Sequence, residues 1–209
     1  MDARRPEPGT ELNTGEPTPP RQAATVIVLR GGTETLEVLL VKRNPKQRFM
    51  GGAWVFPGGA VDAGEGEGDA AHRVAGVREV EEEAGIVLPD PDALVKLSRW
   101  ITPPEVRIRF DTHFFLAEAP PGQEARADGG ECVDLGWFTP SGALEAHERD
   151  EILLVFPTIR TLEQLAPFGS ASELLEWASG REVVPVQPRV LMHGETARIV
   201  LPGEPGYEA

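Results

Sequence analysis

The sequence predicts an α+β fold. Strand-like runs of β-branched or alternating residues lie on both sides of one long helix-like segment. Short helical segments follow in the last third, so the regular strand–helix–strand order of a doubly wound sheet is absent. The chain has 209 residues, 40% of them hydrophobic, which is enough for one domain with a substantial core.

The first half of the chain contains three predicted strands and one long helix. The strands are expected over residues 23–30, 36–43 and 53–56. Gly31 and Gly32 interrupt the first two, which favours a hairpin, and Pro57 stops the third. After an acidic, glycine-rich loop, Asp69 is a suitable N-cap for a helix that runs to Ala84. Gly85 stands where a left-handed residue commonly ends a helix.

The second half is expected to add strands and then short helices. Strands are predicted over residues 94–102, 106–118 and 133–139, and helices over 140–149, 157–165 and 170–179. Thr139 is the expected N-cap of the first of these helices. After Gly180, two weak strand-like stretches contain or flank prolines, which restrict them to a sheet edge or an irregular lid.

This pattern divides the chain into three parts. Residues 1–20 are rich in Pro, Gly, Glu and Thr, so we expect a disordered arm. Residues 21–180 contain the regular pattern and form the predicted domain. Residues 181–209 are expected to be a tail packed on or near that domain.

The net charge of the chain argues against some classes of binding partner. The chain has 20 Lys and Arg against 34 Asp and Glu, a formal charge of −14. This argues against nucleic acid and anionic membranes, but a divalent cation could still bring a phosphate-bearing small molecule to the protein. No apolar run reaches the roughly 20 residues of a membrane span, and the first residues lack a secretory signal. We therefore expect a cytoplasmic protein.

Cysteine and histidine offer little chemistry. Cys132 stands alone, which excludes an intramolecular disulfide and a cysteine-rich zinc site. The histidines show no metal-ligand spacing, so each is expected to be structural or exposed. They are His72, His113, His147 and His193.

A run of carboxylates near the end of the long predicted helix is the main candidate site. At about 100° per residue, Glu79, Glu82 and Glu83 share one face, whereas Glu81 points away. Such a run is also typical of a solvated helix face. Three stacked carboxylates repel one another unless a positive group lies among them, and their oxygens suit Mg²⁺ or Mn²⁺. The opposite, apolar face consists of Val74, Val77, Val80 and Ala84.

The segment from Gly59 to Ile86 resembles the signature of the Nudix hydrolases, G-x5-E-x7-R-E-U-x-E-E-x-G-U, in which U is aliphatic. The second half, beginning at Arg78, matches at every specified position. Gly59 and Glu65 match the first half, but twelve residues instead of seven separate Glu65 from Arg78. We expect this insertion mainly to extend the loop, which makes Glu67 a rival for the loop carboxylate. The resemblance implies a Nudix-type α/β/α sandwich with a mixed sheet, extra C-terminal helices and a short tail.

A second segment, from Leu39 to Gly59, is similar to one found in coenzyme A diphosphatases of this family, LLxKR-[SA]-x3-R-x3-G-x3-FPGG. The spacing is reproduced throughout, and Asn44 is the one specified position that differs. With RWITPP and RFDTHFF further on, the chain looks most like the acyl-coenzyme A diphosphatase branch. In the alternative interpretation, Arg43 and Arg48 are ordinary surface cations, since FPGG precedes many Nudix signatures.

The resemblance implies a metal-dependent hydrolase, with Mg²⁺ or Mn²⁺ as cofactor. It implies Glu79, Glu82, Glu83 and Glu65 as metal ligands, with one of the helix carboxylates serving as base. The predicted catalytic residues are Glu79, Glu82 and Arg78, whose guanidinium would pair with a carboxylate and fix its rotamer. Glu131 could supply a distant carboxylate, although a surface position is the more ordinary interpretation.

Substrate contacts are implied by the same resemblance. Gly58 and Gly59 permit close approach of the backbone, and Arg43 and Arg48 could hold the 3′-phosphate or diphosphate of coenzyme A. Two aromatic residues could line an acyl or pantetheine groove, although each is more commonly a core residue. They are Trp100 and Phe115.

The predicted reaction converts coenzyme A or an acyl-coenzyme A to 3′,5′-ADP and the corresponding 4′-phosphopantetheine. One alternative is a Nudix hydrolase of ADP-ribose, a dinucleotide polyphosphate or an oxidised nucleotide. Another is a Nudix-like module that senses a nucleotide without cleaving it, which the intact helix carboxylates disfavour. The expected partner is a small-molecule diphosphate, and a homodimer is compatible with the sequence.

Overall fold

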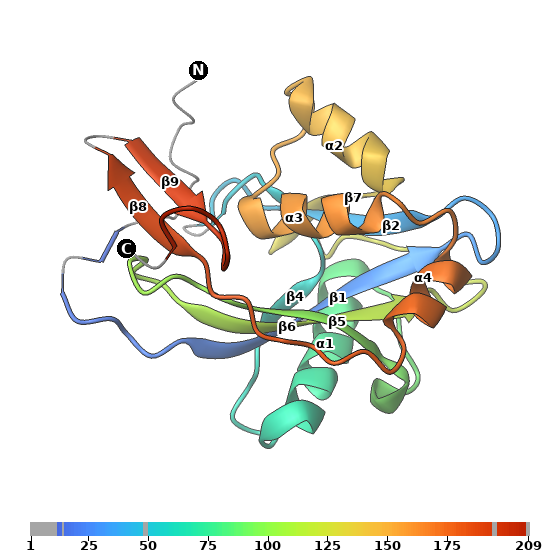
Figure 1. Ribbon diagram of the computed structural model, residues 1–209. Coiled ribbons are helices and arrows are strands. Elements are labelled where there is room, and N and C mark those ends of the chain that lie inside the picture. Colours follow the sequence, from blue (N-terminus) through green and yellow to red (C-terminus); the bar gives the residue numbers. More distant parts are fainter. Residues whose placement is uncertain (1–11, 14, 48–49, 194–195, 208–209) are drawn as a thin grey trace.

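The computed structural model describes residues 12–13, 15–47, 50–193 and 196–207 (Figure 1). Most of the predicted N-terminal arm, at residues 1–11 and 14, lies outside these ranges, as does Arg48. In the part of the chain that is described, no helix is both long enough and apolar enough to cross a membrane. The predicted cytoplasmic location stays a prediction.

Seven strands form one mixed sheet. Its order is β3-β2-β1-β6-β5, with β4 paired to β1 and β7 paired to β2. β1 and β6 run parallel, and the other pairs are antiparallel. This confirms the predicted α+β fold with a mixed sheet. The strands are β1 Arg21–Arg30, β2 Glu37–Arg43, β3 Trp54–Val55, β4 Gly58–Ala60, β5 Val95–Ile101, β6 Phe110–Glu118 and β7 Cys132–Phe138.

Helices cover both faces of the sheet. Figure 1 shows α1 behind the sheet and α3 and α4 in front of it. This arrangement is the predicted α/β/α sandwich, with the last two helices as its C-terminal layer. The helices are α1 Gly68–Ala84, α2 Pro140–Glu148, α3 Phe156–Leu165 and α4 Ala171–Ala178, with a short 3₁₀ turn at Pro91–Ala93.

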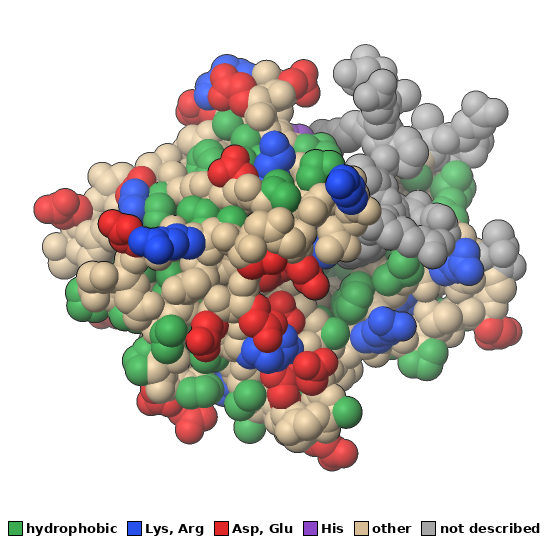
Figure 2. Space-filling model, turned by 180° about the vertical axis from the view of Figure 1, so that it is seen from behind, with side chains coloured by type: hydrophobic (Ala, Val, Ile, Leu, Met, Phe, Trp, Pro, Cys, Tyr) green, Lys and Arg blue, Asp and Glu red, His purple; other side chains and the backbone are tan. Residues whose placement is uncertain are grey.

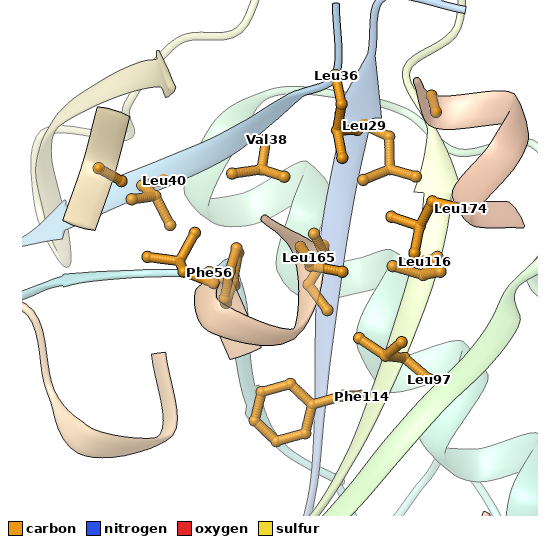
Figure 3. Close-up of a cluster of buried hydrophobic side chains, with 14 of the residues drawn as sticks. Leu29, Leu36, Val38, Leu40, Phe56, Leu97, Phe114, Leu116, Leu165 and Leu174 are labelled. Atoms are coloured by element: carbon orange, nitrogen blue, oxygen red, sulfur yellow. The ribbon is translucent and has the colours of Figure 1, made fainter. Parts of the chain in front are cut away.

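Alternation along β1 divides the core into two clusters. Val26 and Val28 pack with the residues beneath α1, whereas Ile27 and Leu29 pack with those beneath α3 and α4. Figure 3 shows the second cluster, in which Leu165 and Leu174 reach down to the sheet. The period of two in the sequence therefore predicts which side chains enter which core.

The helix ends agree with the sequence in part. Thr139 caps α2 as predicted, since its Oγ1 accepts a hydrogen bond from the Gly142 N–H at 3.1 Å. Gly85 ends α1 at a φ of 67°. Asp69 is not the N-cap of α1, because the helix begins one residue earlier and Glu67 occupies that position without a side-chain cap. Asp69 instead pairs with Arg73 at 2.8 Å.

The strands differ from the predicted ones in three respects. β4 was not predicted, because its glycines carry no strand signal. β6 begins at Phe110, because the preceding residues form a loop rather than continuing the strand. The tail does form two strands, but β8 (Arg189–His193) and β9 (Thr196–Val200) pair with each other in a separate sheet.

Both chain ends contact the domain where they are described. Val186 extends the edge of β5, because the Ile101 N–H donates to its carbonyl at 2.9 Å and its own N–H donates to the Arg99 carbonyl at 2.8 Å. Within the predicted arm, the Asn13 N–H donates to the Glu105 carbonyl at 2.7 Å. The predicted division into arm, domain and tail otherwise stays a prediction.

Candidate active site

Strands β1 and β2 diverge at the point where the glycine-containing loop of the signature-like segment joins the sheet. β1 and β2 pair only at Leu29 with Val38 and at Arg30 with Glu37. Further along β1, the segment that follows β3 takes the place of β2, and the Val26 N–H donates to the Pro57 carbonyl at 3.0 Å. β4 then pairs with β1 and packs against α1. This brings the two glycines of the loop to the carboxylates at the end of α1.

Arg78 lies at the centre of the carboxylate cluster. Its Nε donates to Glu65 Oε1 at 2.8 Å, and its Nη1 donates to Glu79 Oε1 at 2.7 Å and to Glu82 Oε2 at 2.8 Å. Nη2 donates to the Ala60 carbonyl at 3.0 Å. Arg78 is thus the positive group that the stacked carboxylates required. Figure 2, seen from the α1 side, shows acidic side chains gathered near the centre of this face with basic ones among them.

The structure brings Glu65, rather than Glu67, into this cluster. Glu65 Oε2 also accepts a hydrogen bond from the Asp62 N–H at 2.7 Å. Burial opposes ionisation here, but the hydrogen bonds from Arg78 and Asp62 hold the pKa of Glu65 below its usual value. Glu67 stands at the start of α1 and is exposed. The inserted residues lie partly in the loop and partly in the first turns of α1.

Glu79 and the loop glycine Gly59 fit closely together. A Cβ at position 59 would lie 2.2 Å from Glu79 Oε1, so only glycine leaves room for this carboxylate. Burial raises the pKa of Glu79, although Arg78 acts in the opposite direction. Glu82, by contrast, has a side chain that is 58% exposed. Glu79 and Glu82 therefore form a pair of one enclosed and one accessible carboxylate around the shared Arg78 guanidinium.

Glu83 is buried, with only 3% of its side chain exposed. The Gly58 N–H donates to its Oε2 at 3.0 Å, and Arg43 Nη1 lies 3.7 Å from its Oε1. Burial raises the pKa of Glu83 to about 7, partly offset by the Gly58 hydrogen bond. Cys132 is buried beside it, and its own thiol pKa is raised by burial and by Glu83.

The packed face of α1 matches the predicted one in part, since Val80 and Ala84 are buried and Val77 packs partly buried against the same core. Val74 is 41% exposed, whereas Glu83 is among the buried residues of the helix. The buried face carries small residues, among them Ala75 and Gly76. Helical geometry groups Glu79, Glu82 and Glu83 correctly, but it does not reveal that Val74 lies outside the buried face and Glu83 inside it.

Other candidate residues lie apart from the cluster. Glu81 and Glu131 are exposed, although the charge of Glu131 contributes to the raised pKa of Glu79. Phe115 is fully buried, so it cannot line a groove. Trp100 lines a cavity of about 190 Å³ between β5, α4 and the tail. His72 of α1 and His113 of β6 stack with ring centroids 3.8 Å apart, a structural role of the kind expected.

Sequence reasoning missed the orientation of Arg43. Along β2, Leu39 and Val41 pack into the cluster beneath α1, and Arg43 continues this alternation on the same face. Its register partner on β7 is Cys132. The period of two was a sufficient signal for Arg43 but not for Cys132, because the register shifts between Lys42 and Arg43 and leaves Val133 exposed. The predicted substrate contact through Arg43 is not tested by this geometry, but its side chain faces Glu83.

The carboxylate oxygens at the end of α1 suit a divalent cation. Glu79, Glu82 and Glu83 supply hard oxygens, and Glu83 Oε1 is buried without a hydrogen-bond partner among the described residues. Arg78 contacts one oxygen of Glu79 and one of Glu82, so each carboxylate keeps a second oxygen. Within the described ranges, however, no three His, Cys, Asp or Glu side chains converge as a ready cage.

Comparison with known proteins supports the family resemblance that the signature-like segment suggested. The family model described as the NUDIX domain matches residues 19–157. Human "Acyl-coenzyme A diphosphatase NUDT19" is 26% identical over 83% of this chain and 73% of its own length. The Xenopus laevis protein of the same name is 22% identical over 74% of this chain and 66% of its own length.

A solved structure gives the same result for the fold. The NUDIX hydrolase from Alicyclobacillus acidocaldarius superposes with a TM-score of 0.68 at 28% identity. The superposition covers 76% of this chain and 96% of the other. The sheet, α1 and the signature loop thus belong to a shared architecture, whereas the tail extends beyond the matched family region.

Proposed function

This chain belongs to the Nudix family and is a Nudix pyrophosphohydrolase, and we propose that its substrate is coenzyme A or an acyl-coenzyme A. The products would be 3′,5′-ADP and 4′-phosphopantetheine or its acylated form. The observation that carries this proposal is the segment from Leu39 to Gly59, which reproduces the coenzyme A diphosphatase spacing and ends in the loop that meets Glu79. The names of the human and Xenopus relatives support it.

The proposed mechanism uses the residues around Arg78. Glu79, Glu82, Glu83 and Glu65 would hold Mg²⁺ or Mn²⁺, which supplies charge neutralisation and a lowered pKa for a bound water. Arg78 orients Glu79 and Glu82 through one shared nitrogen, which fixes their relative position. One of these two carboxylates accepts the proton of the attacking water.

The loop and the preceding segment would bind the substrate. Gly58 and Gly59 place backbone at the cluster with no side chain in the way, and this allows a diphosphate to approach. Arg48 is the proposed contact for the 3′-phosphate of coenzyme A. Such an Arg–phosphate contact is worth about 1.5–3 kcal/mol, or roughly 10- to 150-fold in affinity.

A substrate panel tests this proposal. The purified chain is incubated with Mg²⁺ or Mn²⁺ and coenzyme A, an acyl-coenzyme A, dephospho-coenzyme A, ADP-ribose or an oxidised nucleotide, and the products are identified by mass. We expect 3′,5′-ADP from coenzyme A and a higher kcat/KM than for dephospho-coenzyme A. Arg48→Ala should remove most of that preference, because the contact is remote from the bond that breaks. Equal kcat/KM values for the two substrates in the unmodified chain would reject the coenzyme A assignment.

The predictions of cellular location, partner and oligomeric state belong to the same proposal. We propose a cytoplasmic enzyme with a small-molecule diphosphate as its partner, and a homodimer remains compatible with it. The same panel distinguishes the two metals by their turnover rates.

A further inference from the structure

Two cations of the coenzyme A-like segment point to opposite faces of β2. Arg43 extends toward the α1 side and has only 18% of its side chain exposed. Lys42 follows Leu40 on the α3 side, where its Nζ lies 6.0 Å from the centre of the Trp54 ring. Neighbouring positions in one motif therefore have different surroundings, and only one of them adjoins the carboxylates of α1.

The surroundings of Arg43 are those of a buried ion pair. Its Nη1 lies 3.7 Å from Glu83 Oε1, and this is the ion pair that Glu83 makes among the described residues. Both Glu83 Oε1 and Arg43 Nε lack a hydrogen-bond partner in the described part of the chain. Removing one member of such a pair leaves the other charge buried and uncompensated, which is strongly unfavourable.

The backbone around Arg43 is fixed on both sides. The Arg43 N–H donates to the Ala53 carbonyl at 2.9 Å, and the Gly52 N–H donates to the Arg43 carbonyl at 3.1 Å. On the other side of β2, Arg43 is paired with Cys132 of β7. Glu83 is held from its second oxygen by the Gly58 N–H at 3.0 Å. The guanidinium and the carboxylate are therefore presented to each other by rigid elements.

From this geometry we propose that Arg43 is a positioning residue, which holds Glu83 at the end of α1 and does not bind the substrate phosphates. The inference rests on the proposed function only in that Glu83 takes part in catalysis. It assigns the two arginines of the coenzyme A-like segment to different tasks: Arg43 orients a carboxylate, and Arg48 remains the candidate substrate contact.

A double-mutant cycle tests the assignment. Arg43→Ala, Glu83→Gln and the double variant are compared by kcat, by KM for coenzyme A and by melting temperature. We expect Arg43→Ala to lower kcat by about 10- to 100-fold with KM changed by less than about 3-fold. In the Glu83→Gln background, Arg43→Ala should change kcat by less than about 3-fold, because the residue it positions is already altered. Arg43→Lys should recover part of the lost kcat.

The melting temperature gives a reading that does not depend on turnover. Arg43→Ala should lower it by several degrees in the unmodified chain and by much less beside Glu83→Gln, since no buried charge is then left unpaired. Arg30→Ala, the loss of a part-exposed cation from the neighbouring strand β1 outside this segment, should leave kcat and KM unchanged.

Two results would overturn the inference. One is a loss from Arg43→Ala that appears mainly in KM and adds in full to that of Glu83→Gln, as a phosphate contact requires. The other is additivity of the two melting-temperature changes. If no member of the panel is hydrolysed by the unmodified chain, the proposed function fails, and the melting-temperature cycle still decides the role of Arg43.

Discussion

Helix α1 and helices α3 and α4 cover opposite faces of one sheet, but they are built differently. α3 and α4 bury large leucines, among them Leu162, Leu165 and Leu174. α1 buries small residues together with the charged Glu83. A Cβ at Gly76 would lie only 2.8 Å from Val26 Cγ2, so α1 packs against β1 at close range. The difference shows that α3 and α4 mainly supply apolar burial, whereas α1 mainly fixes the position of its carboxylates.

The comparison of the two faces predicts that the residues of α3 contribute to stability but not to catalysis. Leu162 is fully buried, and Leu162→Ala should lower the free energy of unfolding by about 2–5 kcal/mol through lost burial and a cavity. The kcat per folded molecule should stay within about 2-fold, because no residue of α3 contacts the carboxylate cluster. Denaturant unfolding and kcat measured on the same preparation check this. A large fall in kcat without loss of stability would contradict the division of roles.

The polar contacts beneath α1 should make stability depend on pH. Burial lowers the pKa of His113 to about 4, and His72 and Arg99 add to this effect. Asp69 on α1, Asp111 on β6 and Lys96 on β5 also face this ring. The unfolded chain binds a proton near the ordinary pKa of 6.5, and the folded chain does not until about pH 4. Stability from this group is therefore complete above about pH 6.5 and is lost as pH falls toward 4.

His113→Asn should remove this dependence. The difference of 6.5 − 4 = 2.5 pKa units corresponds to at most about 3 kcal/mol. We expect the variant to lose less unfolding free energy than the unmodified chain between pH 6.5 and 4, measured by denaturant titration at each pH. Leu162→Ala, on the other face, serves as control because it should leave the pH slope unchanged. Identical slopes in the unmodified chain and His113→Asn would show that the ring does not resist protonation.

Close packing of α1 should reverse the usual effect of replacing a helical glycine. In an exposed helix interior, Gly→Ala stabilises by about 1 kcal/mol. Gly76→Ala should instead destabilise by about 1 kcal/mol or more, because the new methyl group meets Val26 at 2.8 Å and valine has little rotamer freedom. Thermal unfolding decides the sign. A higher melting temperature would mean that α1 can move away from β1 at little cost.

The fold was predictable where periodicity was strong. The β-branched, apolar run in residues 23–30 predicts strand β1, and Thr139 predicts the start of α2. The packed face of α1 was predictable only in part: Val80 and Ala84 are buried as predicted, but Ala75 and Gly76 give no strong apolar pattern and Val74 is exposed. β4 depends on pairing with β1, a tertiary effect that Gly58 and Gly59 do not encode locally.

At the candidate site, too, the features that depend on tertiary packing could not be predicted from the sequence. The resemblance implied a guanidinium at Arg78 that pairs with a carboxylate, and the structure places Arg78 between Glu79 and Glu82. The burial of Glu83 could not be read from the sequence, because it depends on where the loop glycines meet the helix. The inward position of Arg43 could have been predicted from the alternation of β2. The resemblance to coenzyme A diphosphatases suggested a substrate contact instead.

The central claim is that Glu82, the accessible carboxylate of the cluster on α1, serves metal-dependent hydrolysis and not stability. Glu82→Gln, compared with Glu81→Gln one residue away on the exposed surface, tests it most directly. With Mg²⁺ or Mn²⁺ and the best substrate of the panel, we expect Glu82→Gln to lower kcat at least about 100-fold with an unchanged melting temperature. Glu81→Gln should leave both unchanged. Equal activity of the two variants, or an equal loss in both, would contradict the account.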